Sequence, residues 1–227
     1  PCDAIEAQKA TFAVAFNGQP SYIRFGREKS PVFTTQDTPF EIGRAEIFRD
    51  GKDAAIIGCG MLLYNALVAA EELSKEGIEC VVVNSHTVKP IDEKTIIEAA
   101  QKTGAVVSVE EHQVNGGLGS AVAEVLSKNY PVPQEYIGMQ DRFGESGTAD
   151  ELIQAFGMDI GSIKEAVKKV QLEIGQSWES QKSKVEATFS PINETQEEKV
   201  VYSLEQFKKL EDALAASPEA QNYLLRE

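Results

Sequence analysis

The sequence predicts an α/β protein, a three-layer αβα sandwich around a mostly parallel five-stranded sheet with one antiparallel edge strand. Three observations lead to this prediction. Several short segments are apolar throughout, which is typical of parallel strands buried on both faces. They alternate with segments of about ten or more residues that have helical patterns. An Asp-Gly turn at residues 50–51 separates the first two strand segments, which favours an antiparallel hairpin at that edge.

A helix–strand unit precedes this alternation. Asp3 and Glu6 have the spacing of a capping box, and an Asn-Gly pair is a typical end for the helix that follows. Residues 21–25 then predict a short strand. The unit is too small to bury a core by itself. We therefore interpret residues 1–28 as the end of a domain that begins elsewhere, and residues 29–40, with two prolines, as a linker.

The regular alternation extends over residues 41–172, which we interpret as one domain. The strands are predicted at residues 45–49, 53–58, 78–84, 105–109 and 136–138. The helices are predicted at residues 61–75, 90–103, 116–128, 148–156 and 159–172. Crossovers between the parallel strands are expected to be right-handed.

Residues 173–227 differ in composition from the domain before them. Ser, Gln, Glu and Lys dominate the first half of this tail. Capping patterns at Ser203 and at Ser217-Pro218 predict two short helices near its end. No chemistry is assigned to the tail, which either packs elsewhere on the molecule or extends into solvent.

Composition excludes several classes of protein. Apolar residues make up 42% and charged residues 26%, which is ordinary globular usage and argues against a disordered chain. The formal net charge is −14, so binding to nucleic acid or to an anionic membrane surface is not expected. We interpret the acidity mainly as a source of solubility. No apolar stretch approaches the length of about 20 residues that a membrane span requires.

The cysteines and the first residue bear on where the protein is found. Cys2, Cys59 and Cys80 form no pair with metal-ligand spacing, and the last two lie in apolar runs. Reduced, buried thiols and a cytoplasmic location are therefore expected. The sequence begins at Pro1 without a signal-like segment, so we expect a piece of something longer or a processed chain.

The first candidate site is a glycine-rich turn between a strand and a helix. Its backbone amides at Gly116, Gly117, Gly119 and Ser120 could hold an anion or a nucleotide phosphate. The alternative is a tight turn that needs glycine only for its backbone angles. The dinucleotide fingerprint is incomplete, because Val122 stands where glycine or alanine should, and the lysine of a P-loop is absent.

Further polar residues follow strands at the same predicted edge. The carboxylates of Glu110 and Glu111 and the imidazole of His112 could do acid–base chemistry. His86 follows the strand before and could face a cleft or a partner surface. The alternative is that these strand ends simply meet water. With only two histidines in the chain, a histidine-rich metal site is excluded. The polar loop at residues 141–147 is either a binding loop or a salt-bridged corner.

A last candidate lies before the domain. Arg27 follows the predicted strand at residues 21–25 and a glycine, which is a good position for forked recognition of a phosphate or carboxylate. A surface ion pair with a neighbouring side chain is the alternative. The residues do not decide between ligand recognition by Arg27 and a surface ion pair.

Six stretches of the chain, spread over residues 1–172 in one order and spacing, carry a resemblance to a known family. They are DAIEAQKATFAVA, PSYIRFGREKSPVF, PFEIGRAEIFRDGKDAAIIGCG, VVNSHTVKPID, VVSVEEHQVNGGLGSAVAEVL and DRFGESGTADELIQAFGMD. Together they resemble the carboxyl-terminal section of transketolase, a thiamine-diphosphate enzyme that transfers two-carbon ketol units between sugar phosphates. The tail after residue 175 lies outside the resemblance.

The resemblance implies which domains of the enzyme this chain contains and which it lacks. Residues 1–28 match the end of the family's pyrimidine-binding domain, and residues 41–172 match its carboxyl-terminal domain. The family holds thiamine diphosphate and Mg²⁺ through its preceding domains, across a dimer interface, with a Gly-Asp-Gly motif that this chain lacks. The chain alone is therefore expected to bind no cofactor and to be inactive. Its expected partners are a second copy, a missing amino-terminal section, and sugar phosphates.

One functional residue follows from the resemblance. The family places an arginine that contacts the sugar phosphate where the stretch YIRFGRE has Arg27. The carboxyl-terminal domain supplies dimer contacts and no established catalytic group, so no catalytic residue is assigned. Three alternatives remain at this point: a stand-alone anion- or nucleotide-binding module, a dimerisation domain, and the related domain of a deoxyxylulose-phosphate synthase or a 2-oxo-acid dehydrogenase beta subunit.

Overall fold

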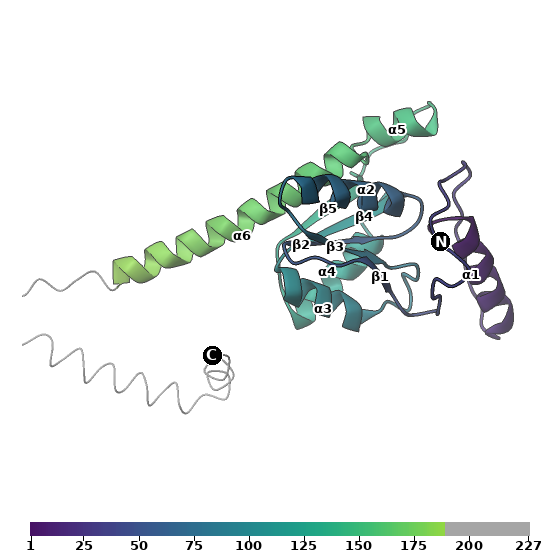
Figure 1. Ribbon diagram of the computed structural model, residues 1–227, viewed down its shortest axis with the longest axis horizontal. Coiled ribbons are helices and arrows are strands. Elements are labelled where there is room, and N and C mark those ends of the chain that lie inside the picture. The colour runs from purple at the N-terminus through teal and green to yellow at the C-terminus, as the bar shows by residue number, and fades with distance from the viewer. Residues whose placement is uncertain (189–227) are drawn as a thin grey trace, which may run out of the picture. The chain divides into compact units, whose positions relative to one another are not determined.

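Five strands form a single sheet in the order β1-β3-β2-β4-β5 in the computed structural model, which describes residues 1–188 and their side chains as far as Ile174 (Figure 1). The strands are β1 (Glu46–Arg49), β2 (Ala54–Gly58), β3 (Cys80–Asn84), β4 (Val106–Gln113) and β5 (Gln134–Met139). The pairs β3–β2, β2–β4 and β4–β5 are parallel, and β1 pairs antiparallel with β3. The predicted sheet, mostly parallel with one antiparallel edge, is confirmed.

Helices cover both faces of this sheet, as Figure 1 shows. The helices among residues 1–188 are α1 (Ala4–Phe16), α2 (Leu62–Lys75), α3 (Glu93–Thr103), α4 (Leu118–Asn129), α5 (Ala149–Ala155) and α6 (Ile160–Thr188), of which α1 contributes no residue to the two cores beside the sheet. Residues of α2 and α6 pack in one core on one face, and residues of α3 and α4 pack in a second core on the other. The three-layer prediction is therefore confirmed.

The alternation of side chains along the central strands explains why both cores form. Ala54 and Ile56 of β2 belong to the core under α2 and α6, whereas Ala55 and Ile57 belong to the core over α3 and α4. Successive strand residues point to opposite faces, so a strand between two helical layers must be apolar at every position. All five residues of β2 are buried accordingly.

The predicted hairpin between the first two strands is wrong. β1 pairs with β3, with Ile47 opposite Val83, and β3 lies between β1 and β2. The chain at Gly51 instead passes close under the start of β3, where a Cβ atom would clash with the backbone. The amides of Lys52 and Asp53 both donate to the Glu79 carbonyl, at 2.9 and 2.8 Å. The Asp-Gly turn therefore directs the chain beneath β3 and does not close a hairpin.

The strand predicted at residues 21–25 is also absent. A strand needs a neighbour for its ladder of backbone hydrogen bonds, and none of the described strands pairs with this segment. The helix before it does form, and Asp3 caps it as expected by accepting a hydrogen bond from the Glu6 amide at 2.9 Å. A sequence that favours a strand is thus left extended and exposed.

The last described helix continues past its predicted end at residue 172, to Thr188. On its first turns, Lys164 contacts Glu72 at 2.8 Å and Glu76 at 3.0 Å, which joins α6 to α2. The helices predicted at residues 203 and 217 lie outside the described residues. Among residues 1–188, no helix combines the length and the apolar character needed to cross a membrane.

Candidate functional site

The candidate site lies at the carboxyl ends of the parallel strands. Open α/β sheets bind ligands there, beside the point where neighbouring strands send their following helices to opposite faces. Here β2 leads to α2 on one face and the adjacent β4 leads to α4 on the other. A pocket of about 490 Å³ opens beside this point, with Met61 from the turn after β2 and Glu111 from β4 in its wall.

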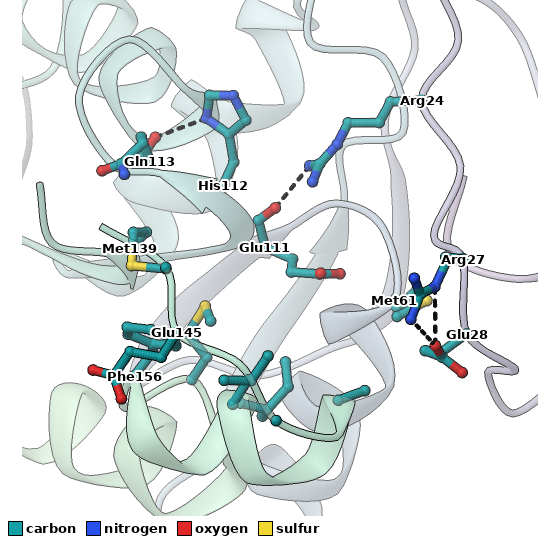
Figure 2. A pocket seen from close by; sticks show the side chains of 16 residues that line it. Arg24, Arg27, Glu28, Met61, Glu111, His112, Gln113, Met139, Glu145 and Phe156 are labelled. Carbon is teal, nitrogen blue, oxygen red and sulfur yellow. Dashed lines mark hydrogen bonds and ion pairs between the residues drawn. The ribbon is translucent and has the colours of Figure 1, made fainter. Parts of the chain in front are cut away.

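The pocket is lined by both apolar and charged side chains, and Figure 2 shows Met61 beside Arg27 and Glu28, and Glu145 beside Phe156. Its apolar residues are Met61, Met139, Ala149, Leu152, Ile153, Phe156 and Met158. The sequence contains three methionines, and all of them line this pocket. Its charged and polar residues are Arg24, Arg27, Glu28, Glu111, His112, Gln113 and Glu145. In Figure 2, Arg27 and Glu28 lie at the opposite side of the pocket from Met139 and Phe156.

Two arginines of the segment before the domain reach this pocket. The Arg24 guanidinium donates through Nη1 to the backbone carbonyl of Glu111 at 2.7 Å, which ties the segment to the end of β4. Arg27 is 93% exposed and, among the described residues, pairs only with the adjacent Glu28, at 2.9 Å. A pair of exposed neighbours contributes little, about 0–1 kcal/mol. A ligand can therefore replace Glu28 as the partner of the Arg27 guanidinium.

The glycine-rich start of α4 holds an anion that belongs to the chain itself. The Glu110 carboxylate accepts hydrogen bonds from the amides of Leu118 at 2.7 Å and Gly119 at 2.8 Å. Glu110 is buried, and a Cβ atom at Gly117 would clash with its carboxylate. Of these two amides, that of Gly119 was a candidate for binding an external phosphate, and it is already engaged within the chain; the need for glycine at 117 is steric.

The Gly116 amide and the Ser120 hydroxyl, from the same predicted anion site, have partners within the chain too. The Ser120 hydroxyl accepts a hydrogen bond from the Gly116 amide at 2.8 Å and donates to the Val114 carbonyl at 2.8 Å. These bonds close the turn between β4 and α4. The alternative interpretation, a tight turn that needs glycine, accounts for the observed contacts.

The three residues predicted to share a polar cleft are placed in two locations. Glu111 and His112 line the pocket, and His112 Nδ1 lies 2.9 Å from the Gln113 carbonyl. His86 is not among the residues that line it. Its ring stacks on Phe40 with 4.2 Å between centroids, and its Nδ1 lies 3.1 Å from the Thr87 hydroxyl. Burial lowers the pKa of His86 and keeps the imidazole neutral.

The described residues do not fit a site for Mg²⁺ and a diphosphate. Among the side chains that the structure describes, as far as Ile174, no group of three or more His, Cys, Asp and Glu is placed to hold a metal ion. The helix start best suited to a phosphate is occupied by Glu110. Burial raises the pKa of Cys59, beside this edge, to about 12, so its thiol is not a ready metal ligand at neutral pH.

Comparison with known proteins decides which family the fold and the site belong to. Residues 43–163, more than half of the chain, match the family model described as "Transketolase, C-terminal domain". The chain belongs to this family. The match includes the whole sheet and the pocket residues from Met61 to Met158, whereas Arg24, Arg27 and Glu28 precede it.

Individual members of the transketolase family extend this result. The chain is 41% identical over 170 residues to a 6-deoxy-6-sulfo-D-fructose transketolase subunit of a Clostridium species, which aligns over 75% of this chain and 53% of that protein. It is 40% identical over 172 residues to a 1-deoxy-D-xylulose-5-phosphate synthase of Trichormus variabilis, over 74% of this chain and 27% of that protein.

A solved structure agrees with the sequence matches. The chain superposes on a structure titled "Split gene transketolase, inactive beta4 tetramer" with a TM-score of 0.74 and 42% identity. The superposition covers 76% of this chain and 56% of that chain. The chain thus spans about half the length of the transketolase subunit and of the solved chain, and about a quarter of the synthase.

Sequence reasoning missed three features of the pocket in this transketolase domain. The methionines were not singled out, because residues 61, 139 and 158 are far apart in sequence. Arg24 was passed over in favour of Arg27, since a contact to the Glu111 backbone leaves no sequence signal. Glu110 did leave a sequence signal. It stands eight positions before Leu118, the first residue of the glycine-rich helix, and a glutamate at that place is a candidate cap for the helix.

Proposed function

We propose that this chain is the carboxyl-terminal part of a transketolase-type enzyme that transfers two-carbon ketol units between sugar phosphates. The rest of the enzyme would bind thiamine diphosphate and Mg²⁺, which supply the chemistry that makes and breaks the carbon–carbon bond. This chain would contribute the substrate's anion site, through Arg27, and contacts between copies. The observation that carries the proposal is the exposed Arg27 guanidinium, which precedes the transketolase-family domain in the sequence and lines a pocket together with residues of that domain.

The contribution of Arg27 follows from its geometry. A planar guanidinium offers two parallel donors to a phosphate, and such charge-assisted pairs are about twice as strong as neutral hydrogen bonds. Glu28 occupies the fork in the free chain, at 2.9 and 3.2 Å. A dianionic phosphate can displace it at small cost because both side chains are largely exposed.

The proposed partners are of two kinds. One is the amino-terminal section that carries the cofactor domains, and the other is a second copy of this chain. The similar solved structure is titled a tetramer of one kind of subunit, and the similar Clostridium protein is named a subunit. Both names support assembly from separate parts. Three free cysteines also fit the reducing cytoplasm, which we propose as its location.

Complementation tests the proposed reaction. The chain alone is expected to show no ketol transfer, and addition of an amino-terminal transketolase section with thiamine diphosphate and Mg²⁺ is expected to produce it. The assay follows loss of a ketose phosphate donor. Similarity to the Trichormus synthase makes deoxyxylulose-phosphate synthesis the second candidate. A complemented enzyme that forms 1-deoxy-D-xylulose 5-phosphate but does not consume ketose phosphate would replace the first candidate by the second.

Substitution of Arg27 tests its role in the complemented enzyme. Arg27→Gln is expected to raise the KM for phosphorylated acceptors about 10- to 100-fold, because a charge-assisted bidentate contact contributes roughly 1.5–3 kcal/mol. Arg27→Lys should recover part of this loss, and the KM for unphosphorylated acceptors should change little. An equal effect on both classes of acceptor would remove Arg27 from the phosphate site.

A further inference from the structure

Arg27 stands in an extended segment that belongs to no helix or strand. None of the described strands pairs with residues 21–25 just before it. A segment without a ladder of backbone hydrogen bonds opens easily, because few contacts oppose its motion. If the Arg27 guanidinium binds the substrate anion, contacts other than strand pairing have to hold its backbone at the pocket.

Arg24 makes the first of these contacts. Its guanidinium donates through Nη1 to the Glu111 carbonyl at 2.7 Å, as Figure 2 shows. The two residues are 87 positions apart, so the bond joins the segment to the end of β4. The register of β4 against β5 shifts between Val109 and Gln113. Such an irregularity interrupts the ladder between two strands, which leaves the Glu111 carbonyl accessible to a donor from outside the sheet.

Gly26 makes the second contact, with Met61 in the turn between β2 and α2. A Cβ atom at Gly26 would lie 2.2 Å from Met61 Sδ, so the backbone of the segment packs directly on this side chain. Gly26 is not among the residues with a positive φ, so glycine serves the close approach here and not a backbone angle. Figure 2 shows Met61 beside Arg27. Arg27 therefore follows directly after a residue that packing holds in place.

The two contacts lie on both sides of the point where neighbouring strands send their helices to opposite faces. Met61 follows β2, and Glu111 belongs to the adjacent β4. The segment thus crosses the crevice between these strands, with Arg27 one residue beyond the second contact. The two arginines also differ in their partners, because Arg24 donates to a backbone carbonyl of the domain whereas Arg27 pairs with an exposed side chain. Arg24 is therefore engaged in holding the segment, and Arg27 is available to a ligand.

We infer that Arg24 is the positioning residue for Arg27. Its bond to the Glu111 carbonyl holds the segment across the crevice, so that the Arg27 guanidinium meets the anionic group of the acceptor. This inference rests on the proposed role of Arg27 in binding a sugar phosphate. When only a fraction of the molecules has the segment in place, the apparent affinity for the acceptor falls by that fraction. Saturating acceptor restores the bound arrangement, so kcat should change little.

Kinetics of the complemented enzyme provide the first test. Arg24→Met, which keeps an unbranched stem but removes the donors, is expected to raise the KM for phosphorylated acceptors about five- to tenfold and to leave kcat within about twofold. The KM for unphosphorylated acceptors should not change, and Arg24→Lys should recover most of the loss. Arg44→Met, at an exposed arginine that is not among the pocket residues, is the matched control and should behave like wild type. An unchanged KM in Arg24→Met, or an equal rise for both classes of acceptor, would overturn the inference.

A double variant separates positioning from direct contact with the substrate. In an Arg27→Gln enzyme the segment has no guanidinium to present, so the addition of Arg24→Met is expected to raise the KM by less than about twofold more. If Arg24 itself bound the anion, the two increases would multiply, and that result would overturn the inference. If Arg27→Gln leaves the KM for phosphorylated acceptors unchanged, the proposed role of Arg27 fails together with the inference. If Arg27→Gln raises this KM and Arg24→Met does not, only the inference fails.

Backbone relaxation measured by NMR tests the same contact in the full chain without catalysis. The amides from Phe25 to Glu28 are expected to have order parameters of about 0.85 in wild type and below about 0.6 in Arg24→Met, whereas the amides of β2 and β4 stay rigid in both proteins. Arg44→Met should again match wild type. A wild-type segment that is already flexible, or equal order parameters in wild type and Arg24→Met, would show that Arg24 does not hold the segment.

Discussion

Replacing Glu110 by alanine is expected to destabilise the protein by about 3–5 kcal/mol, a large share of the usual 5–15 kcal/mol for a domain. The carboxylate is 3% exposed and accepts the Leu118 and Gly119 amides at 2.7 and 2.8 Å. Its removal leaves two buried donors without a partner at the positive end of α4, each costing about 1–3 kcal/mol. Urea unfolding followed by circular dichroism measures the loss.

The neighbouring glutamate offers a matched control. Glu111→Ala removes the same kind of side chain one position later, where it is only partly buried and makes no side-chain hydrogen bond among the described residues. A change within about 0.5 kcal/mol is expected for it. Glu110→Gln should fall between the two, since it keeps one acceptor and loses the charge. A Glu110→Ala protein as stable as Glu111→Ala would mean that the cap contributes little.

The sheet could be predicted from the sequence because its strands carry a local signal. β2 is apolar at every position and β3 at every position before Asn84, and that pattern has one economical explanation, a parallel strand with helices on both faces. Helix ends were marked as clearly, for instance by Gly104, which has φ of 70° and closes α3 with its amide bonded to Ala100. Such signals depend only on residues that are close in the sequence, so they can be recognised without any knowledge of the fold.

The order of the strands could not be predicted in the same way. The Asp-Gly turn before β2 is compatible with a hairpin, but β3 pairs with both β1 and β2 and separates them. That choice depends on burial of β3 between two neighbours, which is a property of the whole sheet. Residues 21–25 show the converse, because a strand-forming sequence remains unpaired where no described strand lies beside it.

The candidate site was predictable in its position and not in its composition. The rule that ligands bind at the carboxyl ends of strands led to Glu111 and His112, which do line the pocket. The rule could not indicate that Glu110, one residue earlier, points into the start of α4. Nor could it bring Met61 and Met158 together, since their proximity arises only when α2, α5 and α6 pack on the same face.

Two aspartates cap helices, as the sequence indicates, and also bind segments that are distant in the sequence. Asp92 caps α3 by accepting from the Thr95 amide at 3.1 Å, and it also accepts from the Ala45 amide at 2.9 Å, just before β1. Asp3 caps α1 and also accepts from the Phe33 amide. The capping pattern is visible in the sequence, whereas the second partner, about 30 or more positions away, is not.

Asp3→Ala is expected to release α1 from the rest of the chain. The Asp3 carboxylate accepts from the amides of Glu6 at 2.9 Å, Phe33 at 2.9 Å and Thr34 at 2.7 Å, and from the Thr34 hydroxyl at 2.7 Å. Loss of these contacts should speed amide hydrogen exchange in α1 by more than about 100-fold, while the sheet amides keep their protection. Asp37→Ala, an exposed aspartate nearby, should leave both unchanged.

The same contacts give the effect of Asp3 a defined pH dependence. Burial alone would raise the pKa of Asp3, but the hydrogen bonds from Glu6, Thr34 and Phe33 outweigh it and hold the pKa below its usual range. A carboxyl with a lowered folded-state pKa stabilises the native state above its ordinary pKa of about 3.9, and this contribution is lost as pH falls through the folded value. The exchange difference between wild type and Asp3→Ala should thus be full at pH 7 and shrink below about pH 4. Asp92 also has a lowered pKa and loses its contribution in the same acid range, in both proteins alike. A difference that stays constant down to pH 3 would show that the Asp3 charge does not hold α1 in place.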